Sequence, residues 1–137
     1  MRLVLDTNIY IASLLYEGLC FDLMRIVFDQ GSGHEVYTSN PILVEIYNKI
    51  ASKKEQISSN SVEWLIFQIK NFTLRTAPKE KIFAVKRDPS DNKILECAVS
   101  ARADLIITMD KDLLKLKSFR GTGIIHPKTF LYMLPKN

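Results

Sequence analysis

The sequence predicts an α/β fold, a three-layer α/β/α sandwich with a central parallel sheet. Short apolar runs, typical of buried strands, alternate along the chain with longer segments whose apolar residues recur at helical spacing. Two of these runs, at 3–5 and 105–108, are followed within two residues by an aspartate. Strands that alternate with helices pair in parallel, because each helix returns the chain to the same edge of the sheet.

The first half of the chain is expected to contain two strands and three helices. A buried strand at 3–5 leads into a helix at 9–15, and a second amphipathic helix at 20–28 stops at a Gly-Ser-Gly turn. After a brief strand at 35–38, capping residues and an early proline predict a helix from about Ser39. The apolar face of this helix consists of Ile42, Leu43, Ile46, Tyr47 and Ile50.

The second half continues the alternation. A helix is expected at 61–72, and residues 82–85 could then form either a strand or the end of a helix. A polar turn at 87–92 precedes an amphipathic helix, which leads into the strongly apolar strand at 105–108. A short helix, a strand and a last helix complete the chain, at 113–116, 124–125 and 127–134.

The composition excludes several classes of protein. With 47% hydrophobic and 25% charged residues, the 137-residue chain is neither disordered nor fibrous, and no repeat or linker divides it. We therefore expect one domain over 1–137. Cys20 and Cys97 lack the spacing of zinc ligands, which favours a reducing compartment. Without a secretion signal or an apolar run of membrane-spanning length, a cytoplasmic protein with no membrane contact is expected.

The charge is distributed unevenly along the chain. Residues 1–69 carry 5 basic and 8 acidic side chains, whereas residues 70–137 carry 14 and 7, for a net charge of +4. This surplus suggests an anionic partner whose binding surface is assembled by folding. The basic residues could equally be the ordinary solvated faces of helices.

Four acids are predicted to meet at one edge of the sheet. Asp6 and Asp110 follow two strands, Asp91 begins a helix, and Glu45 lies in the first turns of another helix. In parallel α/β sheets, ligands bind beyond the carboxyl ends of the strands. Carboxylates gathered there repel one another unless a cation neutralises them, and ligation by oxygen alone favours Mg²⁺ or Mn²⁺. Such a site suits phosphoryl transfer to water.

Each of these acids also has an ordinary interpretation. Asp6 and Asp110 could be plain turn residues, and Asp91 could simply cap its helix. Glu45, taken alone, is typical of a solvated helix residue. Only for Asp6 and Asp110 does the position itself, at the ends of two strands, favour a functional role over an ordinary one.

Four stretches in order along the chain resemble the PIN-domain family. The resemblance is to the bacterial and archaeal members that act as toxins of toxin-antitoxin modules, and it extends to the closing segment at 126–131. The family often has a small residue where this chain has Met109. The matching stretches are 4–8, 39–45, 88–98 and 103–114.

The resemblance implies a metal-dependent ribonuclease. The residues that match the family's acids would hold one or two Mg²⁺ or Mn²⁺ ions, with Asp6 as the central ligand; they are Asp6, Glu45, Asp91 and Asp110. Supporting polar residues would orient carboxylates or waters; they are Thr7, Asn8, Ser39, Asn92 and Thr108. Asp112 would be an auxiliary acid, and Asp88 would shape the turn before it. A small antitoxin and a homodimer are the implied protein partners.

The sequence therefore predicts an endoribonuclease that hydrolyses RNA phosphodiester bonds. Basic residues next to the acidic motifs would hold flanking phosphates; they are Lys86, Arg87, Lys111 and Lys115. A PIN domain that binds RNA or a protein without turnover is one alternative. A small-molecule phosphatase with Asp6 as nucleophile is another, although that chemistry calls for a second aspartate where this chain has Asn8.

Overall fold

The computed structural model describes residues 1–135, so the last two residues of the predicted 1–137 domain lie outside the described residues. One mixed sheet has the strand order β3-β2-β1-β4-β6-β5. All neighbouring strands pair in parallel except β5 and β6, which are antiparallel. The strands are β1 (Arg2–Leu5), β2 (Glu35–Thr38), β3 (Thr73–Arg75), β4 (Leu105–Ile107), β5 (Ser118–Phe119) and β6 (Thr122–Ile125).

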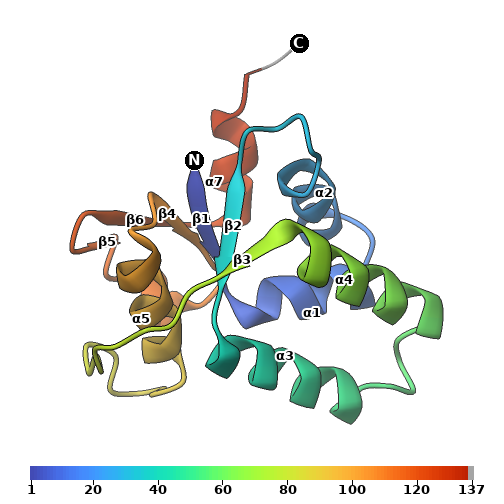
Figure 1. The fold of residues 1–137 in the computed structure, drawn as a ribbon, viewed down its shortest axis with the longest axis horizontal. Coiled ribbons are helices and arrows are strands. Elements are labelled where there is room, and N and C mark those ends of the chain that lie inside the picture. Colours follow the sequence, from blue (N-terminus) through green and yellow to red (C-terminus); the bar gives the residue numbers. More distant parts are fainter. Residues whose placement is uncertain (136–137) are drawn as a thin grey trace.

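Helices cover both faces of this sheet (Figure 1). α5 packs against β1, β2 and β4 on one face, and α1, α2, α4 and α7 gather on the other, while α3 extends beneath the carboxyl ends of the strands. The predicted three-layer α/β/α architecture is confirmed. The helices are α1 (Thr7–Leu15), α2 (Leu19–Val27), α3 (Asn40–Ser52), α4 (Ser59–Phe72), α5 (Asp91–Ala101), α6 (Lys111–Leu114) and α7 (Pro127–Met133).

The two central strands are the two most apolar runs of the sequence. β1 and β4 are buried almost throughout because helices cover both of their faces. They pair so that Leu5 lies opposite Ile107, and the Asp6 amide continues the ladder by donating to the Ile107 carbonyl oxygen (3.0 Å). The polar residues that follow these strands are thereby brought to one place at the carboxyl edge.

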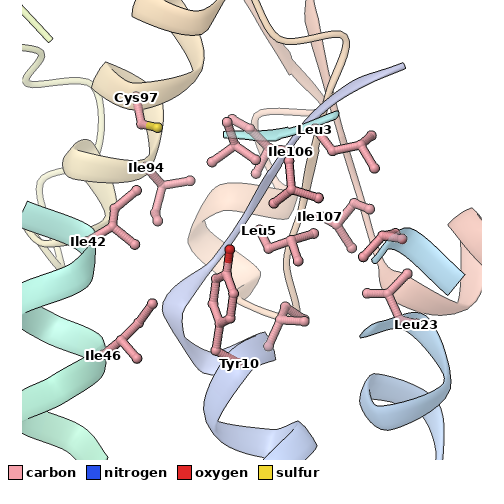
Figure 2. Close-up of a cluster of buried hydrophobic side chains, with 14 of the residues drawn as sticks. Leu3, Leu5, Tyr10, Leu23, Ile42, Ile46, Ile94, Cys97, Ile106 and Ile107 are labelled. Atoms are coloured by element: carbon pink, nitrogen blue, oxygen red, sulfur yellow. The ribbon is translucent and has the colours of Figure 1, made fainter. Parts of the chain in front are cut away.

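The core lies between the sheet and the helices. Figure 2 shows Ile42 and Ile46 of α3 together with Ile94 of α5 on one side of β1, and Leu23 of α2 on the other. These side chains are almost completely buried, and Tyr10 of α1 fills the space beside β1. Burial of such side chains stabilises the fold by about 1.5–3 kcal/mol each, before the entropy of ordering the chain is subtracted.

Several expected elements differ in the structure. Residues 82–85 form neither a strand nor a helix, because the chain there follows α5 without a ladder partner. β3 and β5 were not expected from the sequence, because both are very short edge strands that stay partly exposed. α6 begins at Lys111 instead of residue 113, since the Asp110 side chain caps it. Along residues 1–135, no helix combines the length and apolarity that crossing a membrane would require.

Candidate functional site

A buried threonine links two of the predicted site acids. The Thr108 hydroxyl donates a hydrogen bond to Asp6 Oδ2 (2.7 Å) and accepts one from the Asp110 backbone N–H (2.9 Å). Thr108 is fully buried and follows β4 directly. The sheet register and this one hydroxyl therefore hold both acids at the carboxyl edge.

Asp110 is also fixed by the helix that it begins. Its Oδ1 accepts hydrogen bonds from the backbone N–H groups of Asp112 (2.8 Å) and Leu113 (3.1 Å), at the N-terminus of α6. A carboxylate suits that place because unpaired amides carry partial positive charge. The cap and Thr108 together leave the rest of the Asp110 carboxylate free to face the neighbouring acids.

Three carboxylates meet where α5 begins. Asp88, Asp91 and Asp110 each offer an oxygen, and these oxygens all lie within 4.8 Å of one another. Asp91 is 5% exposed, and its Oδ2 has no hydrogen-bond partner among the described residues. Burial raises the pKa of Asp91 to about 8, and the charges of Asp110, Asp6 and Asp88 act in the same direction.

Sequence reasoning did not rank Asp88 among the metal ligands. Asp88 does shape the turn as expected, since its Oδ1 accepts hydrogen bonds from the Ser90 backbone N–H (3.1 Å) and hydroxyl (2.6 Å). The same exposed carboxylate also joins the three-acid group. Its position three residues before Asp91, with a proline between them, was the signal that could have found it, because such a turn folds the two side chains together.

Asp6 and Glu45 lie beside this group rather than within its 4.8 Å limit. Burial is the main cause that raises the pKa of Asp6, and the charges of Asp110 and Glu45 raise it further. The Thr108 hydrogen bond and the charge of Lys49 oppose that rise. Asp6 therefore lies within the electrostatic reach of both Asp110 and Glu45, and the structure gathers all four predicted acids around one edge.

A lysine that the sequence analysis did not single out lies among these acids. Lys49 Nζ pairs with Glu45 Oε1 (3.1 Å), one turn earlier on α3, and donates a hydrogen bond to Asn8 Oδ1 (2.7 Å). The i,i+4 spacing from Glu45 was the available signal, since residues four apart share a helix face. Lys49 is the internal counter-ion of this part of the site.

The other predicted supporting residues have varied surroundings. Thr7 is fully buried, and its hydroxyl has no partner within residues 1–135. Ser39 is fully buried near Cys97, whose pKa burial raises to about 12 against a smaller opposing effect of the Ser39 hydroxyl. The Asn92 side-chain amide donates a hydrogen bond to the Val85 carbonyl oxygen (2.7 Å) and accepts one from the Val85 backbone N–H (2.9 Å).

The predicted phosphate-binding residues and Met109 lie toward the surface. Met109 is 36% exposed, and its sulfur lies 3.9 Å from Cys20 Sγ. The predicted basic residues are all exposed; they are Lys86, Arg87, Lys111 and Lys115.

Comparison with known proteins decides the family. The sequence profile of the PIN domain matches residues 2–112. The chain belongs to the PIN-domain family. The fold of this PIN domain is similar to that of a chain in the crystal structure of VapBC2 from Rickettsia felis bound to a DNA fragment from their promoter. The two share 13% sequence identity with a TM-score of 0.64, over 92% of this chain and 98% of that one. No curated protein matches the sequence.

The donor set of this PIN domain fits a hard divalent cation. The grouped atoms are carboxylate oxygens, and neither cysteine nor histidine belongs to the group. Such oxygens are the ligands that Mg²⁺ and Mn²⁺ prefer. The buried, unpartnered Oδ2 of Asp91 is the strongest single indication, because a buried carboxylate oxygen without a partner is unfavourable until a proton or a cation reaches it.

We expect the stability of the metal-free protein to fall as pH rises from about 5 to about 8. The folded state raises the pKa of Asp91 from 3.8 to about 8, so it retains a proton that the unfolded chain has lost over this range. Stability decreases with pH wherever the folded state binds more protons. Thermal unfolding in EDTA should show a Tm that drops by several degrees, and Asp91→Asn should flatten the profile. An unchanged profile in that variant would contradict the assignment.

Proposed function

We propose that the chain is a metal-dependent endoribonuclease and the toxin of a toxin-antitoxin pair. The carrying observation is the group of three carboxylates within 4.8 Å, with a buried and unpartnered Asp91 Oδ2. Ionised carboxylates grouped in this way destabilise the folded protein unless a cation binds them, because their mutual repulsion and their desolvation both oppose the ionised form. Membership of the PIN-domain family supports nuclease chemistry for this cation site.

The residues that would hold Mg²⁺ or Mn²⁺ are the four predicted acids, with Asp88 added by the structure. When bound, the metal would supply positive charge for the scissile phosphate and lower the pKa of a water. Thr108 fixes the direction of Asp6 Oδ2, and the α6 amides fix Asp110 Oδ1, so neither carboxylate needs to reorganise as charge develops. The metal-holding acids of the proposal are Asp6, Glu45, Asp88, Asp91 and Asp110.

RNA is the proposed substrate, and its phosphates are proposed to lie on the basic residues beside the acids. Lys86 and Arg87 precede the three-acid group on one side, and Lys111 and Lys115 follow Asp110 on the other. Phosphate contacts of this kind make nucleic acid binding fall with salt. By analogy with the VapBC2 complex, we also propose a small antitoxin partner. The homodimer and the cytoplasmic location remain proposals that rest on the sequence and its family resemblance.

Incubation with labelled single-stranded RNA tests the proposed activity. Cleavage is expected in the presence of Mn²⁺ or Mg²⁺. It should stop when EDTA is added and resume when excess metal is added. Asp110→Asn, purified in parallel, is the control for contaminating ribonuclease and is expected to be inactive. Cleavage that ignores EDTA would overturn the proposal, and RNA binding without cleavage in any metal would favour a PIN domain without turnover.

We expect Lys49→Met to tighten Mn²⁺ binding by about three- to tenfold. The Lys49 ammonium pairs with Glu45 and lies within electrostatic reach of Asp6, so it opposes a second cation at the same carboxylates. Calorimetric titration with Mn²⁺ measures the change, and Lys70→Met on the distant helix α4 is the matched control. Unchanged affinity in Lys49→Met would show that this charge does not act on the metal site.

A further inference from the structure

The segment between β3 and α5 is long and irregular. Residues 76–90 contain neither helix nor strand, and in Figure 1 they form the yellow stretch that leaves β3 and passes α5. We refer to residues 79–87 as the basic strap. Structureless connections of this length in a compact fold are uncommon and are often functional.

Buried side chains of α5 anchor the basic strap. Ile82 and Val85 are 4% and 6% exposed, so their side chains pack into the core. The Ile82 backbone N–H donates to Glu96 Oε2 (3.1 Å), and the Asn92 amide pairs with both backbone groups of Val85 (2.9 and 2.7 Å). These hydrogen bonds take the place of the backbone hydrogen bonds that a β-strand would form with its neighbour, so the strap holds a defined conformation.

The anchored strap turns an aromatic ring toward solvent. Phe83 is 76% exposed, although its neighbour Ile82 is buried. Within residues 1–135 the Phe83 ring makes no ring contact. A single exposed apolar side chain is common on protein surfaces, so the chemistry around Phe83 decides what it can bind.

Basic residues precede and follow this ring along the strap. The nine residues of the strap carry four basic side chains and one acidic one, and the acid, Glu80, is paired with Arg120 (2.7 Å). Along the strap, Phe83 therefore lies between basic residues that form no ion pair within residues 1–135, which favours a polyanion with apolar faces over an apolar protein surface. The four basic residues are exposed; they are Lys79, Lys81, Lys86 and Arg87.

The strap leads directly to the three-acid group. Arg87 precedes Asp88, which belongs to the three-acid group, and Asn92, which anchors the strap, follows Asp91. Just beyond the strap, a hollow of about 920 Å³ lies between Pro89 and Lys93 on one side and Glu45 of α3 on the other. A chain of nucleotides lying on the strap would thus enter the proposed cation site.

We propose that the basic strap binds single-stranded RNA, with Phe83 stacking on one base and the flanking lysines and Arg87 contacting phosphates. This inference rests on the proposed function, since it names how that site takes its substrate. Stacking on an exposed ring requires an unpaired base, so the strap selects single strands over duplexes. It also guides the backbone toward Asp88, Asp91 and Asp110.

Fluorescence anisotropy with a labelled, unstructured oligonucleotide tests the strap in EDTA, where binding is measured without cleavage. Phe83→Ala is expected to weaken binding about five- to hundredfold, which is the usual loss of one base-stacking contact. Phe83→Trp should retain the affinity. Phe67→Ala, which removes an exposed phenylalanine of α4, is the matched control and should change binding less than twofold.

Salt dependence tests the cations of the strap. The double variant Lys81→Ala and Lys86→Ala should reduce the slope of log affinity against log salt by about 1.4, since each single-strand phosphate contact contributes about 0.7. Lys70→Ala should leave the slope unchanged.

Failure of this inference is distinguishable from failure of the proposed function. If Phe83→Ala binds the oligonucleotide as wild type does, or if duplex RNA depends equally on Phe83, the strap proposal is overturned even when cleavage occurs. If Phe83 and the lysines govern binding but no metal supports cleavage, the strap stands and the nuclease proposal falls.

Discussion

Asp6→Asn is expected to slow RNA cleavage on the order of 10³-fold while raising the Tm of the metal-free protein. Asp6 is 5% exposed, and burial, Asp110 and Glu45 all raise its pKa. The substitution removes a charge that the proposed metal requires, so transition-state stabilisation is lost. It also removes a charge that the metal-free fold disfavours, so stability is gained. Opposite signs for activity and stability are typical of strained functional sites.

Cleavage rates in Mn²⁺ and thermal unfolding in EDTA measure the two effects separately. The Tm gain should grow with pH, because burial raises the pKa of Asp6 and its disfavoured ionised form becomes more populated as pH rises. Glu63→Gln, an exposed acid of α4, is the matched control and should change neither quantity. A fully active Asp6→Asn would refute the central role of this carboxylate, and a lowered Tm would refute the electrostatic account of its burial.

The parts of the structure that the sequence predicts are those governed by strong local patterns. The apolar runs of β1 and β4 and the amphipathic helices that cover them indicate a buried parallel sheet, and the pairing of β1 with β4 brings the segments that carry Asp6 and Asp110 to the same edge. Gathering Glu45 and Asp91 at the same edge needed only that each helix start there, as helices after parallel strands do.

The parts that it does not predict depend on contacts between distant segments. β3 exists because Thr73 to Arg75 pair with β2, and nothing in those three residues distinguishes them from a loop. Residues 82–85 of the basic strap include β-forming residues. Their backbone groups, however, form hydrogen bonds with the side chains of Asn92 and Glu96 of α5 instead of with a neighbouring strand. Two contacts at the site also depend on folding: the hydrogen bond from Lys49 to Asn8, and the approach of Asp88 to Asp110.

Asn92→Ala is expected to destabilise the protein by about 2–6 kcal/mol. Asn92 is 5% exposed, and its amide satisfies both the N–H and the carbonyl of Val85. Alanine would leave two buried backbone groups without partners, and each such group costs about 1–3 kcal/mol. Urea unfolding measures the loss. Asn71→Ala is the matched control and should cost much less, because it removes a single exposed hydrogen bond from the Asn71 amide to the Phe67 carbonyl oxygen on α4 (2.8 Å).

Amide hydrogen exchange in Asn92→Ala distinguishes the two roles open to this residue. If Asn92 holds the strap, exchange at Ile82 and Val85 should accelerate more than exchange in the core strands, and Mn²⁺ affinity should change little. If Asn92 instead orients a carboxylate, as the family resemblance implies, Mn²⁺ affinity should fall about 10- to 100-fold with the strap still protected. The amide nitrogen and oxygen of Asn92 both bond to Val85, which favours the first result and makes Asn92 the residue that joins the proposed RNA surface to the three-acid group.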